Sequence, residues 1–226
     1  FSGIGTEKST GTAIVCLTGL IEYPGIYEVP MGLTIRQVID KLGGGVSNGK
    51  TLKVLQTGGP LGGVLGAESL DIRIDFDEMA AAGAIFGSGG LIVGDQDTSV
   101  VDLIRVLVQF CQYESCGKCF PCRLGMTQLM DIIERIARFE GKPDDLDVCE
   151  RVGSTMQMGS LCAHGQLGFN PISSALKYFR EEFDVHVNQH YDPTGRTSTK
   201  FFAPKSSRVY AEDSISNKES INLIRK

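Results

Sequence analysis

The hydrophobic pattern of the chain changes its period near residue 96. Before this point, short runs of β-branched and aromatic residues bounded by Gly and Pro predict strands. The predicted strands are TAIVCLTG (12–19), GIYEVP (25–30), LKVLQT (52–57), LDIRI (70–74) and GLIVG (90–94). Residues 34–45 predict one short helix, with Thr34 as N-cap, Gln37 completing a capping box and Gly43 ending the helix. Strands interrupted by a single helix predict a small mixed sheet, an α+β arrangement.

After residue 96 the apolar residues recur at helical spacing. Helices are predicted at 97–111, 123–139, 144–157 and 170–183. Ser99 and Asp102 can form a capping box in the first helix, and Asn170 and Pro171 suit the N-cap and first position of the last one. Four helices of this length predict a small bundle. Beyond about residue 188 the chain is polar and lacks apolar periodicity, which predicts a loosely ordered tail or a segment lying over a partner.

Composition and charge exclude several classes of function. The 226 residues carry a net charge of −5 without a basic run, so the chain lacks the electrostatic footprint of a nucleic-acid-binding protein. No window approaches the roughly 18 consecutive apolar residues of a membrane span, so we expect membrane contact only through partner proteins. The chain starts at Phe1 without a charged-then-apolar leader. We therefore expect a cytoplasmic protein whose natural polypeptide starts earlier.

Three of the seven cysteines carry the strongest chemical signal. ESCGKCFPCR contains Cys116, Cys119 and Cys122 at C-x2-C-x2-C spacing. An odd, clustered set of cysteines favours reduced thiols over a disulfide framework. Thiolates are soft ligands that suit iron–sulfur clusters, zinc and Cu(I). Cubane clusters use this local spacing together with a fourth cysteine from elsewhere in the chain.

The fourth ligand is predicted to be Cys162. It lies in GSLCAHG, a glycine-flanked loop before a capped helix, where a side chain can be directed inward. The other candidates, Cys16, Cys111 and Cys149, fall inside predicted elements and are expected in the core. His164 is expected to be a hydrogen-bonded loop residue rather than a ligand. The alternative is a four-thiolate zinc site that only stabilises the bundle, but such sites usually present two separated C-x2-C pairs.

Two glycine-rich stretches, GGPLGG (58–63) and GSGG (87–90), are weaker signals. Neither has the glycine spacing or the Lys-Ser/Thr pair of a nucleotide-binding loop. We therefore interpret both as tight turns with positive φ in the small sheet.

The cysteine segments ESCGKCFPCRLG and SLCAHGQLGFNPISSALKYFREEF resemble the cluster-binding end of the flavoprotein subunit of respiratory complex I. The same module occurs in diaphorase subunits of NAD-linked formate dehydrogenases and hydrogenases. Upstream, LTGLIEYPGIYEVPMGLTIRQVIDKLGGG, GGPLGG and GSGGLIV resemble the ubiquitin-like β-grasp (SLBB) domain that precedes it. The resemblance implies the trailing edge of a flavin and NADH domain (1–11), an SLBB domain (12–95), a four-helix 4Fe–4S domain (96–187) and a polar tail (188–226).

The resemblance also implies a function. A 4Fe–4S cluster on Cys116, Cys119, Cys122 and Cys162 would take single electrons from FMN, which NADH reduces in a domain outside this chain. The chain would then be an electron relay within an NADH dehydrogenase or diaphorase complex, with no catalytic, FMN or NAD residue of its own. Implied partners are a thioredoxin-like 2Fe–2S subunit and a multi-cluster ferredoxin-like subunit, in a cytoplasmic complex that can be peripheral at the inner face of a membrane. The cysteine-free tail favours the complex I or formate dehydrogenase branch over the hydrogenase branch.

Overall fold

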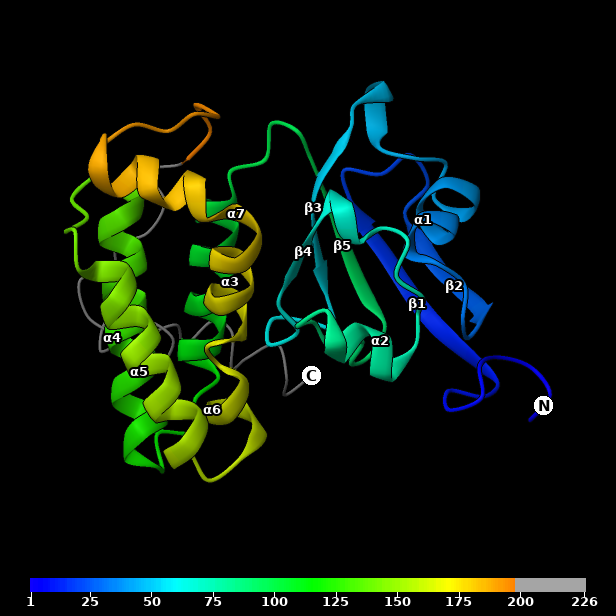
Figure 1. The fold of residues 1–226 in the computed structure, drawn as a ribbon, viewed down its shortest axis with the longest axis horizontal. Helices are drawn as coiled ribbons and strands as arrows, with labels where there is room; N and C mark the ends of the chain where they lie inside the picture. The colour runs from blue at the N-terminus through cyan, green and yellow to red at the C-terminus, as the bar shows by residue number, and fades with distance from the viewer. Residues whose placement is uncertain (198–226) are drawn as a thin grey trace, which may run out of the picture.

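A computed structural model of the chain describes residues 1–197 and shows a mixed α/β fold. A sheet with short helices and a set of long helices lie side by side (Figure 1). The polar tail predicted from residue 188 falls largely on residues 198–226, outside the described residues. Within residues 1–197, no helix is both long and apolar enough to cross a membrane.

The sheet has five strands in the order β2-β1-β5-β3-β4. They are β1 (Thr12–Gly19), β2 (Gly25–Pro30), β3 (Leu52–Thr57), β4 (Val64–Gly66) and β5 (Gly90–Asp95). β5 pairs in parallel with β1, while the pairs β1–β2, β3–β5 and β3–β4 are antiparallel. Four of the predicted strands are confirmed, and the last strand along the chain occupies the centre of the sheet.

The strand predicted at 70–74 is wrong. Residues 67–69 form a short 3₁₀ helix, η3 (Ala67–Ser69), and the following segment makes a single isolated bridge, between Thr34 and Arg73. Its backbone instead pairs with the start of the first helix: Ile35 N donates to Ile72 O at 3.0 Å and Arg36 N to Leu70 O at 2.8 Å. Apolar and polar residues do alternate in this segment, but its backbone hydrogen-bonds to the start of α1 and not to a neighbouring strand.

The helix predicted at 34–45 is confirmed in two parts, α1 (Ile35–Gln37) and a π-helical turn, η1 (Val38–Leu42). Its capping box is present, because Gln37 N donates to Thr34 Oγ1 at 3.1 Å and Thr34 N to Gln37 Oε1 at 3.0 Å. A short 3₁₀ turn, η2 (Ser47–Gly49), leads into β3, and α2 (Phe76–Ala81) was not predicted. These elements and the sheet enclose the first core, which includes Val15, Leu17, Ile35, Val38, Leu55, Leu65, Ile74, Met79 and Leu91.

Both glycine-rich stretches form turns, as predicted. Gly58 and Gly59 have φ of 64° and 81°, and Gly87 and Gly89 have φ of 54° and 81°, a region that favours glycine. The two turns touch, because Gly58 N donates to Gly90 O at 2.8 Å.

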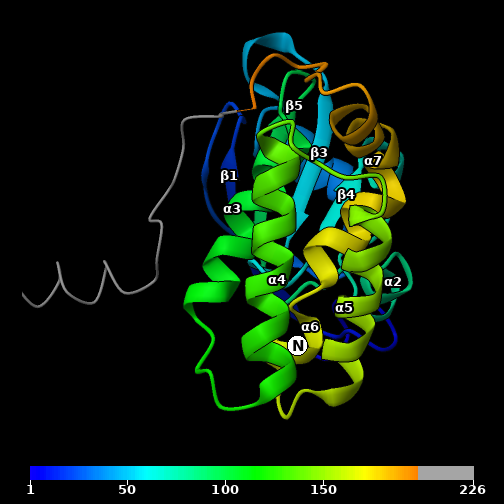
Figure 2. The ribbon, with the colours of Figure 1, turned by 90° about the vertical axis from the view of Figure 1, so that its left-hand side faces the viewer.

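Four long helices form the second half: α3 (Val100–Tyr113), α4 (Phe120–Ala137), α5 (Asp145–Gly159) and α7 (Asn170–Asn188). The short α6 (Ala163–Leu167) precedes α7. Ser99 is the N-cap of α3, as expected, and supplies one half of the predicted capping box, since Asp102 N donates to Ser99 Oγ at 3.2 Å. The N-cap of α7 is Phe169, one residue before the predicted Asn170. The helices stand against one another in front of the sheet (Figure 2).

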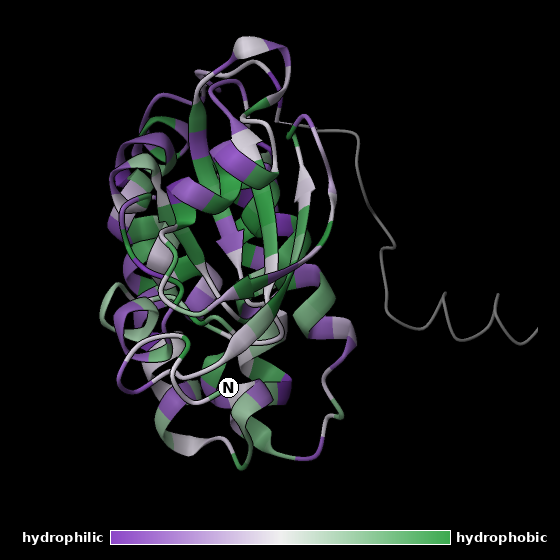
Figure 3. Cartoon of the chain, turned by 90° about the vertical axis from the view of Figure 1, so that its right-hand side faces the viewer, coloured by the Kyte–Doolittle hydropathy of each residue, from purple (hydrophilic) through white to green (hydrophobic). Residues whose placement is uncertain are grey.

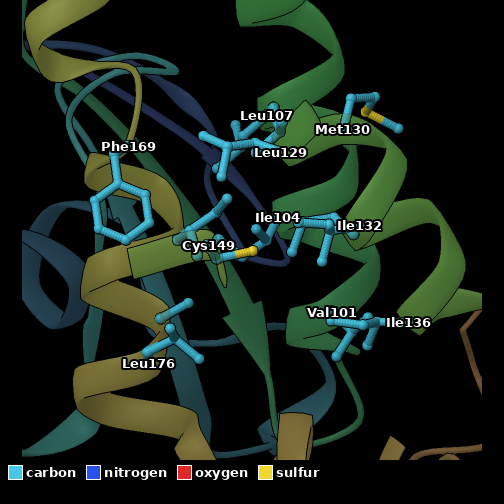
Figure 4. Packing of buried hydrophobic residues seen from close by; sticks show 14 of the residues in the cluster. Val101, Ile104, Leu107, Leu129, Met130, Ile132, Ile136, Cys149, Phe169 and Leu176 are labelled. Atoms are coloured by element: carbon cyan, nitrogen blue, oxygen red, sulfur yellow. The ribbon is translucent and has the colours of Figure 1, made fainter. Parts of the chain in front are cut away.

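The second core lies between these helices and reaches the sheet. Cys149 points into it together with Ile104 and Leu129 (Figure 4). Val54 of β3 and Val64 of β4 belong to the same core, so one edge of the sheet packs against the helices. In Figure 3 green stretches run along several strands, with white and purple residues between them.

Polar contacts also join the sheet to the helices. Glu182 of α7, which is buried, accepts hydrogen bonds from Lys53 Nζ at 2.6 Å and from Val100 N at 2.7 Å. Ser174 Oγ accepts from Val64 N at 2.8 Å. One carboxylate and one hydroxyl of α7 therefore hold β3 and the edge strand β4.

The residues after α7 fold back through Asp192, which is buried. Burial alone would raise the pKa of this carboxyl, but hydrogen bonds outweigh it and lower the pKa to about 2. The donors include Thr197 N at 2.6 Å and Thr194 N at 2.8 Å. The fold therefore stabilises the charged carboxylate form of Asp192.

Candidate functional site: the cysteine loops

Two loops at the same end of the helices carry the four predicted ligand cysteines (Figure 2). The first joins α3 to α4: Cys116 is exposed, Cys119 is the N-cap of α4 and Cys122 is buried in its first turn. The second joins α5 to α6 and ends at Cys162, the exposed N-cap of α6. The spacing of the first loop thus places one thiol on the loop, one at the cap and one inside the first turn of a helix.

The cysteine loop is ordered by local hydrogen bonds. Gly117, with φ of 69°, allows the chain to turn, and its N–H donates to Ser115 Oγ at 3.3 Å. Arg123 is exposed, and its Nη1 donates to Gly117 O at 3.2 Å, which ties the side chain to the loop. Lys118 is exposed on the same loop.

The two loops meet across Gly165. A Cβ added at this glycine would lie 2.5 Å from Ser160 Oγ and 2.9 Å from Cys122 Cβ, so a side chain there would push the loops apart. The Leu161 N–H lowers the pKa of the Cys119 thiol. A backbone N–H of the second loop therefore acts on a cysteine of the first.

Cys122 is the buried member of the set. Burial raises the pKa of its thiol, and the neighbouring thiols of Cys119, Cys162 and Cys116 raise it further. Ser115 Oγ lies 3.3 Å from Cys122 Sγ and acts in the opposite direction. Each of the other three predicted ligands is thus near enough to Cys122 to raise the pKa of its thiol.

The remaining cysteines differ in environment. Cys111 and Cys149 have no exposed surface, and burial raises the pKa of each to about 12, which is typical of inert packing thiols. Cys16 was expected in the core, but it is exposed on β1. His164 is hydrogen-bonded as predicted, with Nε2 2.8 Å from Cys111 O, and so links α6 to the end of α3.

The buried hydroxyl of Ser160 indicates whether the site suits an iron–sulfur cluster. Its side chain is 6% exposed, and its Oγ makes no hydrogen bond of ordinary geometry with any residue in 1–197. A buried hydroxyl without a partner costs about 1–3 kcal/mol. Because this hydroxyl faces a set of soft thiol ligands, a group that brings sulfur acceptors fits the site. As the described side chains stand, no three or more His, Cys, Asp or Glu residues converge to hold a single metal ion.

The sequence interpretation missed Ser115 and Ser160. Each precedes a predicted ligand by one or two residues, in ESC and GSLC. Their place next to a cysteine could have identified them, because hydrogen bonds to cluster sulfurs help to set the potential of a cluster.

Known proteins match both halves of the chain. Residues 14–65 match the family model of the SLBB domain, and residues 102–186 match the NADH-ubiquinone oxidoreductase-F iron–sulfur binding region. All four predicted ligand cysteines lie within the second match.

Individual relatives agree with these matches. The chain is 42% identical to NADP-reducing hydrogenase subunit HndC of Solidesulfovibrio fructosivorans, over 85% of this chain and 39% of that protein. It is 36% identical to an F-type subunit of the NADH-quinone oxidoreductase of Rhizobium meliloti (strain 1021), over 85% of this chain and 46% of that protein. The chain spans less than half the length of these curated relatives, which come from both branches considered in the sequence analysis.

Among solved structures, a crystal structure of NAD+-reducing NiFe-hydrogenase in the H2-reduced state has a similar fold. The TM-score is 0.74 at 27% identity, covering 86% of this chain and 33% of that chain.

Proposed function

Since the chain carries an SLBB domain followed by the iron–sulfur binding region of the NADH-ubiquinone oxidoreductase-F family, we propose that it is the electron-relay portion of an NADH-linked oxidoreductase subunit. The cofactor that this region implies is a 4Fe–4S cluster, and we assign Cys116, Cys119, Cys122 and Cys162 as its ligands. When bound, such a cluster supplies one-electron redox chemistry. The observation that carries the assignment is the meeting of the two cysteine loops, where a Cβ added at Gly165 would lie 2.5 Å from Ser160 Oγ and 2.9 Å from Cys122 Cβ.

The surrounding residues prepare the thiols for this role. The thiolate is the form that binds metal, and the Leu161 N–H lowers the pKa of Cys119, which favours that form. Cys119 also caps α4, a helix of 18 residues, whose N-terminal N–H groups stabilise nearby negative charge. Arg123 fixes the loop through Gly117 O. Together these groups offset the negative charge of several thiolates at one place.

The domain organisation follows from the two cores. We propose an SLBB domain over residues 12–95 and a helical 4Fe–4S domain over 96–187, flanked by the segments 1–11 and 188–226. Two groups of buried residues, one around the sheet and α1, the other between the long helices, support this division. FMN and NAD(H) are proposed for a preceding domain of the complete subunit, where NADH would reduce the flavin by hydride transfer.

Exposed apolar side chains around the cysteine loops support a role inside a larger assembly. Phe120, Met158 and Leu161 are 65%, 84% and 77% exposed. Large apolar groups gathered at one end of a protein commonly mark a protein–protein interface. We propose redox subunits as partners, of the thioredoxin-like 2Fe–2S and multi-cluster ferredoxin-like types, in a cytoplasmic complex that can lie against the inner face of a membrane.

Metal analysis tests the proposal against its alternative, a structural zinc site. The chain would be purified anaerobically and assayed for iron, acid-labile sulfide and zinc. We expect about four irons and four sulfides per chain and a paramagnetic signal after reduction. One zinc without sulfide would contradict the electron-relay function and support the four-thiolate zinc site.

A further inference from the structure

In the cysteine loops, as far as residues 1–197 describe them, the buried hydroxyl of Ser160 lacks a hydrogen-bond partner. Its backbone is fully used: Ser160 N donates to Met156 O at 3.0 Å, and Ser160 O accepts from Gln166 Nε2 at 3.1 Å. Its side chain is more than nine-tenths buried, and Oγ makes no ordinary hydrogen bond within residues 1–197. The backbone contacts therefore hold in place a hydroxyl that has no partner of its own.

The surroundings direct this hydroxyl toward the cysteines. Gly165 leaves the space that Ser160 fills, because a Cβ there would lie 2.5 Å from Ser160 Oγ and 2.6 Å from Ser160 Cβ. The same added Cβ would lie 2.9 Å from Cys122 Cβ, so the Ser160 hydroxyl and Cys122 border one glycine where the two cysteine loops meet. A serine hydroxyl carries one proton to donate, and a thiolate bound to iron is an acceptor.

We propose that the Ser160 hydroxyl donates a hydrogen bond to a sulfur of the cluster bound by the two cysteine loops and thereby raises the reduction potential of that cluster. The inference rests on the proposed function. Reduction adds negative charge to the cluster, and a donor directed at its sulfurs stabilises the reduced form more than the oxidised form. Ser160 thus holds no metal itself but shifts the balance between the two redox states.

Ser115 provides an instructive contrast. Its Oγ lies 3.3 Å from Cys122 Sγ, but it also accepts a hydrogen bond from Gly117 N at 3.3 Å. Replacing Ser115 would disturb the shape of the cysteine loop as well as a sulfur contact. Within residues 1–197 the Ser160 hydroxyl makes no hydrogen bond of this kind, so its replacement isolates the effect on potential.

The experiment is a redox titration of the cluster-loaded chain, followed by paramagnetic resonance, for the unmodified protein and Ser160→Ala. We expect unchanged iron and sulfide content and a more negative midpoint. At a fixed potential near the midpoint the ratio of reduced to oxidised cluster should fall several-fold, up to about tenfold, which corresponds to 59 mV for a one-electron couple. Ser154→Ala, at an exposed serine of α5, the helix for which Ser160 is the C-cap, is the matched control and should not shift the midpoint.

The outcomes separate this inference from the proposed function. An unchanged midpoint with an intact cluster overturns the role of Ser160 and leaves the relay intact, whereas an unmodified chain without iron and sulfide contradicts the relay itself. Loss of iron from a folded Ser160→Ala chain also overturns the inference, because the hydroxyl would then be needed for binding. Ser160→Gly is a second variant without the hydroxyl, and a midpoint that moves in only one of the two variants has the same consequence.

Discussion

Replacing Glu182 tests most directly how the sheet and the helices are held together. Its carboxylate, on α7, accepts from Lys53 Nζ of β3 and from the N–H of Val100 at the start of α3. The Glu182 side chain is 8% exposed and that of Lys53 is 22% exposed. Replacing Glu182 by Ala leaves a largely buried ammonium group without its anion and a helix N-terminal N–H without its acceptor.

The expected loss of stability follows from this geometry. Removing one partner of a buried ion pair costs about 3–5 kcal/mol. Lys53 retains partial contact with water and a hydrogen bond to Thr98 O at 2.7 Å, so the cost should fall at the lower end of this range. We expect Glu182→Ala to lower the free energy of unfolding by about 3 kcal/mol.

Urea-induced unfolding followed by circular dichroism measures this change. The matched control is Glu181→Ala, at an exposed neighbouring glutamate, which should stay within about 0.5 kcal/mol of the unmodified chain. The double variant Lys53→Met/Glu182→Leu should recover part of the loss, because an apolar pair can replace a buried ion pair. A loss below about 1 kcal/mol in Glu182→Ala would refute the reasoning, since that is the size of a solvent-screened surface pair.

Three further predictions concern other parts of the chain. Cys162→Ser should lower iron content or distort the paramagnetic resonance signal of the reduced cluster, whereas Cys149→Ser should cost only packing stability; the reverse pattern would contradict the ligand assignment. Gly153→Ala should destabilise the chain by about 1–3 kcal/mol, because the added Cβ overlaps the ring of Phe169, and an unchanged melting temperature would contradict this packing. The lowered pKa of Asp192, about 2 against an ordinary 3.8, gives about 2 kcal/mol of stability above pH 4 that is lost as the pH falls toward 2. Asp192→Asn should remove that part of the pH dependence, so a stability difference that stays constant from pH 7 to pH 2.5 would contradict it.

The sequence was informative where local chemistry decides the structure. The apolar period located the four long helices, and Thr34 and Ser99 were identified as N-caps because their hydrogen bonds reach only a few residues along the chain. The strand predicted at 70–74 failed because alternation does not reveal a partner, and this segment pairs with the start of α1. α2 could have been found from Asp75 and Glu78, which are spaced as an N-cap and third helical residue.

In the candidate site, too, local features were predictable from the sequence and long-range contacts were not. The spacing of the three local cysteines indicated a shared ligand set, because it depends on one short loop. The nearness of the second loop depends on how α5 returns along α4, a matter of long-range packing around Gly165. The buried hydroxyl of Ser160 is visible only once that packing is known, since nothing in GSLC distinguishes it from an exposed serine.

The strand order has a consequence for how the protein is made. β5 lies between β1 and β3, yet it is the last of the five strands to leave the ribosome. Until residue 95 has emerged, β1 and β3 have no common neighbour, and only the two hairpins β1–β2 and β3–β4 can form. Isolated hairpins are at best marginally stable in water. A nascent chain that ends at residue 65, where the SLBB match stops, would therefore carry most of the strands of this sheet without the strand that joins them.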